Sequence, residues 1–419
     1  MTRRITALAV AAVTVLAGTA ACSKSNSGNN SNKTLVVGVD LPYQGAQKDT
    51  SNATLNAMQL YLDSVGGKAG NYKVQLKQYD DSTAATGKWE DNQCRQNADA
   101  HVANTNEVAV MGTYNSGCAK LEVPKLNQDT TGPLLMISNA NTNPGLTKKW
   151  DANEPEKYYP SGKRNYARVI TTDDIQGPAG ARFAAKDLSV KKVYIINDSE
   201  TYGQGVGKAF QDEAAKQGLT VLGNQVWDGK QPNYTALFNN IKATNPDAIY
   251  LAGICDNNGG QLIKDKVAVL GDNKGVKLIA PDGFTGCSDT VDKLPQAEGM
   301  YLSTPGLDTS QIQAAGGGGG KLLDAYKAKY NAAPPSGYVM YGVQALQVIL
   351  AAIAKSDGTR KGVRDAVFSG SGITISASDA VIGKDVKIDP QSGDVNTLDI
   401  SILHMTNGEE KFFKPYPVS

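Results

Sequence analysis

Short runs that are apolar throughout alternate with amphipathic stretches along most of the chain. The first apolar run is LVVGVDL (35–41), and the helical periodicity that follows it over 52–67 ends at two adjacent glycines. Strands that are apolar throughout are buried on both faces, as in parallel sheets that are covered by helices on each side. The pattern therefore predicts an α/β protein built on doubly wound parallel sheets.

The alternation occurs twice, as two series of similar size. The first series ends with the run LLMIS (134–138), and the second opens at RVITTDDIQG (168–177) after a long polar insertion. A chain of 419 residues is also too long for one ordinary hydrophobic core. We therefore expect two lobes, each with its own sheet.

After the second series the sequence returns to long helices and then to strand-like patterns, as expected of a chain that crosses back between two hinged lobes. The five glycines at 316–320 follow no strand, and we interpret them as a flexible loop. The expected boundaries give two segments to each lobe, namely 34–170 and 308–385 to the first, and 171–307 and 386–419 to the second.

The N-terminus has the pattern of an export signal. Two arginines precede an apolar stretch over 5–16, and small residues then lead to Cys22. The apolar stretch is too short for a stable membrane span, so we expect residues 1–21 to be removed as a signal peptide. A cysteine at this place resembles a bacterial lipoprotein signal and predicts that Cys22 is lipidated, with 22–33 as a flexible polar linker. Plain secretion, with cleavage just before this cysteine, is the alternative.

Charge and motifs exclude several functions. Lys and Arg total 42 against 41 for Asp and Glu, and this balance gives no support for a nucleic-acid-binding surface. The stretch YGQGVGKAF (202–210) lacks the spacing of a phosphate-binding loop, and neither HExxH nor G-x-S-x-G occurs. We therefore expect no enzyme activity, no cofactor and no metal.

Beyond Cys22 the chain has four cysteines, Cys94, Cys118, Cys255 and Cys287. An even number in an exported chain suggests disulfides, and four cysteines allow three pairings. We favour 94–118 and 255–287, because each closes a short loop that stabilises the fold by about 3 kcal/mol in the loop-entropy description. A zinc site is the other interpretation, but no CxxC spacing occurs and neither histidine is nearby in the sequence.

Small and hydroxyl-bearing residues follow two successive strands of the first series. Ser116 and Gly117 come after the run VAVMG, and Asn141 and Thr142 come after LLMIS. Ligands of parallel sheets collect at the carboxyl ends of strands, where helix N-termini offer unpaired N–H groups to an anion. The sequence thus predicts an anion site at this edge, although Ser116 as a cap of its own helix is the simpler interpretation.

The second series has acidic residues and a tyrosine at corresponding places. Asp173, Tyr202 and Asp282 each lie just beyond a predicted strand. Carboxylates at these positions are suited to a cation, although each taken singly is more often a turn or helix cap. Donors in one lobe and carboxylates in the other together predict a zwitterion held between the lobes.

The order and spacing of several motifs resemble a known family. The chain is similar, over Thr34 to Lys414, to the branched-chain amino-acid type (leucine/isoleucine/valine-binding) substrate-binding proteins of ABC transporters, which have the type I periplasmic-binding fold. The motifs that carry the resemblance are LVVGVDLPYQGAQKD, DSVGGKAGNYKVQLKQYDDS, GTYNSGCAKLEVP, SNANTNPGLT, YGQGVGKAF and LIAPDGF.

The resemblance implies ligand-binding roles in the first lobe. Ser116, together with the backbone around Gly117, matches the residue that binds the α-carboxylate of an amino acid. Ala140 and Thr142 match the backbone and hydroxyl groups that hold both ends of the zwitterion.

It implies acidic partners in the second lobe. Asp282 matches the acidic residue for the α-ammonium, Asp173 or Asp174 falls near a further acidic position, and Tyr202 faces the cleft. The chain departs from the family where a tyrosine contacts the ammonium, because no aromatic residue occurs at 254–255, and Asp282 is shorter than the usual glutamate.

The sequence and the resemblance together predict an extracytoplasmic lipoprotein that binds a small zwitterionic ligand, a branched-chain or related amino acid, between its lobes and delivers it to ABC permease subunits. Its contact with the membrane would be through the lipid anchor alone. Two alternatives belong to other classes of protein. A sensory module would bind the same ligand for a signalling partner, and a secreted α/β hydrolase would need a nucleophile and a base at a strand end.

Overall fold

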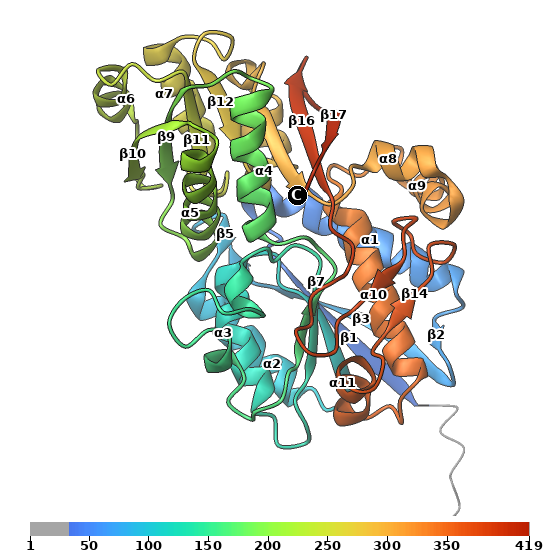
Figure 1. Cartoon of the computed structure of the whole chain (residues 1–419). Helices are drawn as coiled ribbons and strands as arrows, with labels where there is room; N and C mark the ends of the chain where they lie inside the picture. The colour runs from blue at the N-terminus through green and yellow to red at the C-terminus, as the bar shows by residue number, and fades with distance from the viewer. Residues whose placement is uncertain (1–32, 419) are drawn as a thin grey trace, which may run out of the picture.

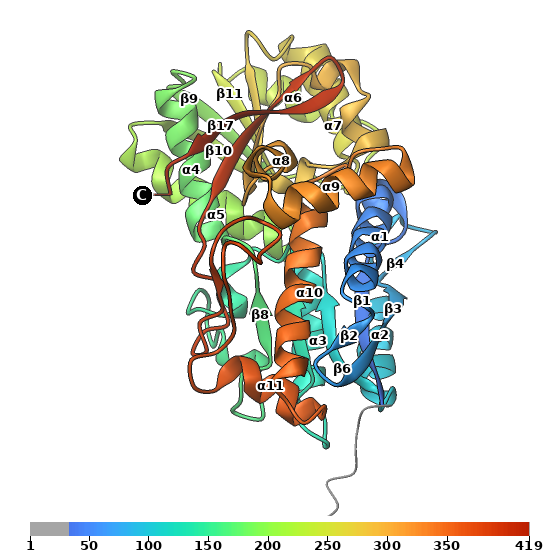
Figure 2. The ribbon, with the colours of Figure 1, turned by 90° about the vertical axis from the view of Figure 1, so that its right-hand side faces the viewer.

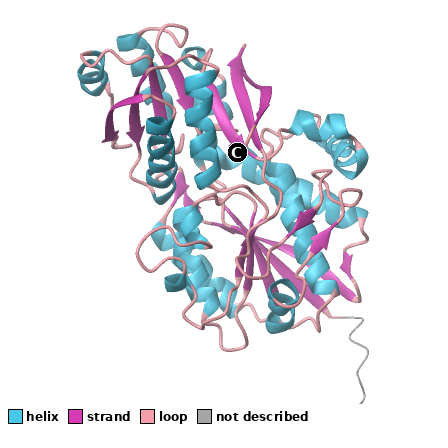
Figure 3. Cartoon of the chain, viewed as in Figure 1, coloured by secondary structure: helices cyan, strands magenta, loops and turns pink. Residues whose placement is uncertain are grey.

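The computed structural model describes residues 33–418 of the chain. They form two α/β lobes, each built around its own sheet, one above the other in the view of Figure 1. Figure 3 shows the same layering by element type, with helices packed on the faces of both sheets. The signal peptide, Cys22 and most of the linker that the sequence predicts lie outside the described residues.

The first sheet is parallel except at one edge. The central strand β1 (Thr34–Leu41) pairs in parallel with β3 on one side and β6 on the other, and the short β2 joins β3 in an antiparallel turn. In spatial order the other strands are β2 (Lys68–Ala69), β3 (Tyr72–Asp80), β6 (Glu107–Gly112), β7 (Leu135–Ser138) and β8 (Tyr166–Arg168).

Helices cover both faces of the first sheet (Figure 1). Alternate residues of the strands point to opposite faces, so Ala109 and Met111 join one apolar cluster while Val110 joins another. One face is covered by α2 (Asp91–Ala103) and α3 (Ser116–Asn127), and the other by α1 (Lys48–Ser64), α9 (Gly317–Tyr330), α10 (Tyr338–Ala354) and α11 (Arg360–Phe368).

The second sheet is mixed. Its parallel part has the strand order β10, β9, β11, β12 and β13, and the C-terminal hairpin of β16 and β17 extends it in antiparallel fashion. The strands are β9 (Lys192–Asn197), β10 (Thr220–Val226), β11 (Ala248–Ala252), β12 (Lys277–Ala280), β13 (Tyr301–Pro305), β16 (Ile400–Thr406) and β17 (Glu409–Tyr416). The helices are α4 (Asp173–Lys186), α5 (Thr201–Lys216), α6 (Thr235–Lys242) and α7 (Gly259–Leu270).

Three connections run between the lobes. The chain leaves the first sheet after β8, returns from β13 through α8 (Thr309–Ala315) towards α10, and reaches the second sheet again at β16. Figure 2 shows α10 and the long C-terminal segment running along the first lobe before the hairpin of β16 and β17 closes the second. Val386 and Val395, in the segment before β16, pack in the apolar cluster of the first lobe.

The predicted fold class is confirmed: the described residues form two α/β lobes, each built on its own largely parallel sheet. The assignment of residue ranges to lobes stays a prediction. Two details of the sequence analysis are wrong. Arg168, with which we expected the second series to open, ends β8 instead, and this strand pairs with β7 in the first sheet. Gly317–Gly320, expected as a flexible loop, form the first turn of α9, where Gly319 is needed because a Cβ would lie 2.0 Å from the Val381 carbonyl oxygen.

Both lobes are crosslinked. The structure joins Cys94 to Cys118 and Cys255 to Cys287, which is the pairing favoured from the sequence. The first disulfide ties α2 to α3, and all four cysteines are fully buried. Within residues 33–418 no helix has the length and apolar character needed to span a membrane.

Removing the first disulfide should destabilise the protein. The bond closes a loop with a sequence separation of 24 residues, so the paired change Cys94→Ala and Cys118→Ala should lower the free energy of unfolding by about 3 kcal/mol. Urea unfolding followed by circular dichroism measures this loss. An unchanged midpoint in the double variant would contradict the stabilising role of the crosslink.

Candidate functional site

The second lobe contributes a buried carboxylate that both lobes hydrogen-bond. Asp282 follows β12 and begins a short 3-10 helix, Asp282–Phe284, with 6% of its surface exposed. Its Oδ1 accepts a hydrogen bond from the Tyr202 hydroxyl at 2.7 Å, and its Oδ2 accepts one from the Tyr338 hydroxyl at 2.6 Å. Tyr202 lies in α5 of the same lobe and Tyr338 in α10 of the other, so this carboxylate sits at the junction of the lobes.

A second carboxylate, that of Asp173, is buried without a partner. Asp173 is the first residue of α4 and is fully buried, and its backbone N–H donates to the Thr142 carbonyl oxygen at 2.9 Å. Neither of its carboxylate oxygens has a hydrogen-bond partner among the described residues. Burial, followed by the negative charge of Asp282, raises the pKa of Asp173 well above its usual value.

Neutral hydroxyl groups surround these acids. The rings of Tyr114 and Tyr338 pack edge to face with centroids 5.4 Å apart. The hydroxyls of Tyr114 and Tyr250 are buried and unpartnered in the described part of the chain. Burial, followed by the charge of Asp282, raises the pKa of Tyr114 well above 10, so this phenol remains a neutral donor.

The first lobe places Ser116 at the start of α3. The helix begins at Ser116, directly after β6, and the residue preceding it is Asn115. The Ser116 hydroxyl oxygen accepts a hydrogen bond from the backbone N–H of Asn143 at 3.3 Å, so it connects two strand ends instead of capping its own helix. Ser116 is 3% exposed.

Gly117 has a packing role that the sequence did not reveal. A Cβ at this position would lie 2.4 Å from the Trp89 ring, which packs against the first turn of α3. Trp89 belongs to β5 (Lys88–Trp89), which pairs with β4 (Ser82–Thr83) in a small hairpin. The glycine therefore admits an indole ring close to the backbone N–H groups of the helix start.

The loop after β7 contains the other predicted first-lobe residues. The backbone N–H groups of Ala140 and Asn141 both donate to the Ser138 hydroxyl, at 3.1 and 2.9 Å. The Asn141 side chain is fully used, since it donates to the Tyr114 carbonyl and accepts from the Tyr166 hydroxyl. Asn141 thus shapes the loop, whereas the buried Thr142 hydroxyl has no partner within the described chain.

Arg168 organises this loop, and sequence reasoning missed it. Its guanidinium donates to the carbonyl oxygens of Asn141 and Asn143 at 2.8 and 2.9 Å, and to Asp394 Oδ1 at 2.8 Å. Arg168 is fully buried, and Asp394 lies 226 residues away in the chain. No local pattern in the sequence signals a pair at that separation.

The lobes contact each other directly around these residues. Asn143 Nδ2 donates to the Thr201 carbonyl oxygen at 3.3 Å, and Lys88 Nζ forms an ion pair with Glu200 at 3.1 Å. Near the start of α1 the Ala46 N–H donates to Asp256 Oδ1 at 3.1 Å. The structure therefore has the lobes closed upon one another.

The second disulfide includes Cys255, at the position where the resemblance would place an aromatic residue. Gln47 at the start of α1 reaches across from the first lobe, with its Nε2 atom 3.4 Å from Cys287 Sγ and 3.6 Å from Cys255 Sγ. Ile254 is buried beside this disulfide, and its N–H donates to Asp198. Gln47 and the Cys255–Cys287 disulfide thus form a contact between the lobes, and no aromatic residue occurs at 254–255.

A chain of contacts links the predicted residues of the two lobes. Asn141 holds Tyr114, the Tyr114 ring packs on Tyr338, and Tyr338 donates to Asp282. The structure brings Thr142 against Asp173 through a backbone hydrogen bond. The residues predicted from the sequence therefore meet where the lobes join, and their roles toward a ligand stay predictions.

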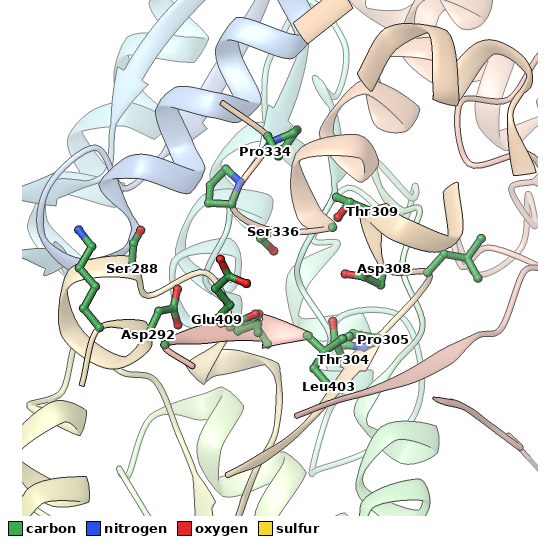
Figure 4. Close-up of a pocket in the computed structure, with 18 residues that line it drawn as sticks. Ser288, Asp292, Thr304, Pro305, Asp308, Thr309, Pro334, Ser336, Leu403 and Glu409 are labelled. Carbon is green, nitrogen blue, oxygen red and sulfur yellow. The ribbon is translucent and has the colours of Figure 1, made fainter. Parts of the chain in front are cut away.

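A separate cavity opens beside the connection from β13 to α8 (Figure 4). Its volume is about 380 Å³, and the residues drawn around it include Asp292, Asp308, Ser336 and Glu409. None of the predicted ligand-binding residues lines it. Asp308 there caps α8 by accepting from the Ser310 N–H, so at least one of its acids is used structurally.

Comparisons with known proteins agree with this architecture. The family model described as "Periplasmic binding protein" matches residues 34–393. The Leu/Ile/Val-binding protein of Escherichia coli is 26% identical over 306 residues, which cover 71% of this chain and 72% of the relative. The Leu/Ile/Val/Thr-binding protein of Salmonella typhimurium is 27% identical over 225 residues, so the match spans 54% of this chain and 55% of that protein.

Solved structures have the same fold. The leucine-binding protein LivK of Thermotoga maritima matches with a TM-score of 0.72 and 20% identity, covering 91% of this chain and 98% of that one. A solute-binding protein of Rhodopseudomonas palustris in complex with 3,4-dihydroxybenzoic acid matches with a TM-score of 0.72 and 19% identity, covering 92% of this chain and 98% of that one.

The unpartnered carboxylate predicts an unusual effect of substitution. The change Asp173→Asn should raise the unfolding free energy of the ligand-free protein at pH 8 by about 1–3 kcal/mol, because it removes a buried charge with no partner. A carboxyl whose pKa is raised on folding stabilises the fold below its unfolded pKa and loses that contribution as the pH rises. The gain should therefore be absent near pH 4 and grow towards pH 8.

Urea unfolding of the variant and the wild type across this pH range measures the difference. A variant that is less stable than the wild type at pH 8 would show that Asp173 has a structural partner in the folded protein.

Proposed function

The chain belongs to the periplasmic binding protein family, and from this membership and the site geometry we propose that it binds a small amino acid between its lobes. A branched-chain or related amino acid is the class of ligand that fits best. The curated relatives include proteins named for leucine, isoleucine and valine binding, which supports this class.

One observation carries the proposal, namely two buried carboxylates at the junction of the lobes. Asp282 is satisfied by two phenols, whereas Asp173 has no partner among residues 33–418. A buried carboxylate is stable only when it is neutralised or paired, and the ammonium group of an amino acid supplies both a charge and N–H donors. A plain aromatic acid of the kind bound by the Rhodopseudomonas protein would instead add a third negative charge.

The other end of the ligand would face the first lobe. The first turn of α3 has unpaired N–H groups and the positive end of the helix dipole, with the Ser116 hydroxyl beside them. The buried Thr142 hydroxyl is on the loop that Arg168 fixes. These groups are suited to a carboxylate, so donors in one lobe and acids in the other match a zwitterion.

Binding would proceed by closure of the two lobes. The first lobe holds its donors rigidly, because Ser138 and Arg168 fix the loop after β7. It would take up the carboxylate first, and closure would then bring Asp173 and Asp282 to the ammonium group. A ligand favours the closed state only by contacts that the open state lacks, and the second-lobe carboxylates are such contacts.

We further propose that the protein is a lipoprotein on the outer face of the membrane and delivers its ligand to ABC permease subunits. The export signal and the cysteine at position 22 in the sequence support anchoring through a lipid. The Rhodopseudomonas palustris protein is described as a solute-binding protein of an ABC transporter, which supports a role in transport as against sensing.

Substitutions at both ends of the site should weaken binding. Ser116→Ala and Asp282→Asn should each reduce the affinity for the best amino-acid ligand by about 1–3 kcal/mol, because each removes a hydrogen-bond partner from a charged group. Isothermal titration calorimetry against the amino acids, their amides and small carboxylates identifies the ligand in the wild type and gives the loss in each variant.

Glu409→Gln is the matched control for these variants. It also removes one negative charge, but from the separate cavity of Figure 4, and it should leave the affinity unchanged. Wild-type affinity in both Ser116→Ala and Asp282→Asn would rule out the assigned site. Binding of benzoates in preference to every amino acid would rule out the proposed ligand class.

The anchor can be tested separately from ligand binding. The change Cys22→Ala in the full-length gene should abolish incorporation of labelled palmitate and release the protein from the membrane fraction of a bacterial host. Fractionation of cells that express each form, followed by immunoblotting, measures this. Equal labelling of the wild type and the variant would contradict lipidation at this cysteine.

A further inference from the structure

A second group of buried ionisable side chains lies inside the first lobe, between the sheet and the helices α2 and α3. It consists of Asp40, His101, Glu107 and Glu122, which we call the His101 cluster. All four side chains are fully buried. None of them belongs to the ligand-binding site described above.

The imidazole ring of His101 is held from one side and faces carboxylates on the other. Its Nδ1 atom hydrogen-bonds Glu107, whose other oxygen accepts from the Tyr79 hydroxyl at 2.7 Å. Its Nε2 atom lies 2.9 Å from Asp40 Oδ2 and 4.0 Å from Glu122 Oε2. The ring therefore presents Nε2 to two acids while a third acid fixes its orientation.

One carboxylate oxygen of the cluster lacks a hydrogen-bond partner among the described residues. Glu122 Oε2 is buried and has no hydrogen-bond partner in the described chain, although it points towards His101 Nε2. Burial, followed by the negative charges of Asp40 and Asp81, raises the pKa of Glu122. Asp81 is likewise fully buried, and neither of its carboxylate oxygens has a hydrogen-bond partner in the described chain. The cluster thus has more carboxylates than its single imidazole can neutralise.

The nearest arginine does not correct the imbalance. The Arg360 guanidinium donates to the carbonyl oxygens of His101 and Glu107 and forms an ion pair with Asp129. It binds the backbone behind the cluster and not its carboxylates. A positive charge between Asp40 and Glu122 would balance the carboxylates that His101 leaves unpaired.

We propose that the His101 cluster binds one divalent transition-metal ion, Zn²⁺ or Mn²⁺, through His101 Nε2, Asp40 Oδ2 and Glu122 Oε2. The potential ligand atoms of these three residues all lie within 4.8 Å of one another. Imidazole nitrogen with carboxylate oxygen is a donor set that suits these ions. A carboxylate on the other ring nitrogen, as Glu107 provides, is the usual means of orienting a metal-binding histidine.

The spacing of the ligand atoms is compatible with one ion. Two ligands about 2.0–2.2 Å from a tetrahedral metal are roughly 3.3–3.6 Å apart. The separations of 2.9 Å to Asp40 and 4.0 Å to Glu122 lie on either side of that range. Shifts of less than about 1 Å in these separations would bring them into that range.

The fold supports the three ligands rigidly. Asp40 is on β1, His101 on α2 and Glu122 on α3, and the Cys94–Cys118 disulfide ties the two helices together. Gly38 on β1 leaves the necessary room, because a Cβ there would lie 2.6 Å from Glu107 Oε1. The ion would thus join one strand and two helices, including the helix that begins at Ser116.

Metal content and stability test the proposal directly. The untagged full chain, purified without chelator, should contain about one Zn²⁺ or Mn²⁺ per molecule by plasma mass spectrometry. The site is buried, so the metal is removed by unfolding in guanidinium with EDTA, with the disulfides kept intact. Refolding with added Zn²⁺ or Mn²⁺ should raise the melting temperature by roughly 3 °C or more over refolding without metal.

The variant Glu122→Gln should lose both the bound metal and the metal-dependent shift in melting temperature. Glu154→Gln is the matched control, since Glu154 is a buried carboxylate of the same lobe that already pairs with Lys120 and Lys157. It should keep the metal content of the wild type.

Wild-type protein that contains neither metal, and that refolds to the same melting temperature with and without both ions, would overturn the proposal. A proton shared between Glu122 and Asp40 would then neutralise the cluster. This result is obtained on the wild type alone, so it does not depend on whether a variant folds. It is also independent of ligand binding between the lobes.

Discussion

The position of Asp282 depends on two tyrosine hydroxyls that come from different lobes. Tyr202 fixes the carboxylate within its own lobe, and Tyr338 reaches it from α10 of the other. Because an isolated buried carboxylate is costly, these two hydrogen bonds are what keep an acid at the junction. Because Tyr338 and Asp282 belong to different lobes, their hydrogen bond forms only when the lobes meet. The Tyr338 hydroxyl therefore both holds the Asp282 carboxylate and stabilises the closed arrangement.

In the first lobe the loop after β7 is also held in place, but by an arginine instead of tyrosine hydroxyls. The buried guanidinium of Arg168 donates to the carbonyl oxygens of Asn141 and Asn143 in this loop and forms an ion pair with Asp394. Asp394 lies on the segment that leads from the first lobe to the C-terminal hairpin of the second. The loop that holds Thr142 is therefore set by a connection between the lobes, and its hydroxyl is placed before any ligand arrives.

The sequence predicted the elements that depend on local patterns and missed those that depend on distant pairs. Apolar runs such as 35–41 identified the parallel strands, and the position of Ser116 and Asp282 at strand ends brought them to the junction of the lobes. Arg168 and Tyr338 were missed because their partners are distant in sequence, and the glycines of α9 because propensity yields to tertiary packing. The role of Gly117 was likewise invisible without the Trp89 ring.

In the proposed function, closure and binding would be coupled most directly through Asp173. The contacts formed between the lobes, such as Asn143 with Thr201 and Lys88 with Glu200, stabilise the closed arrangement with or without a ligand. Asp173 would oppose them, because closure would bury its carboxyl group beside Asp282 without a hydrogen-bond partner among the described residues. An ammonium group that pairs with Asp173 would reverse the sign of this contribution. The differential affinity that drives closure would then arise from relieving an unfavourable burial.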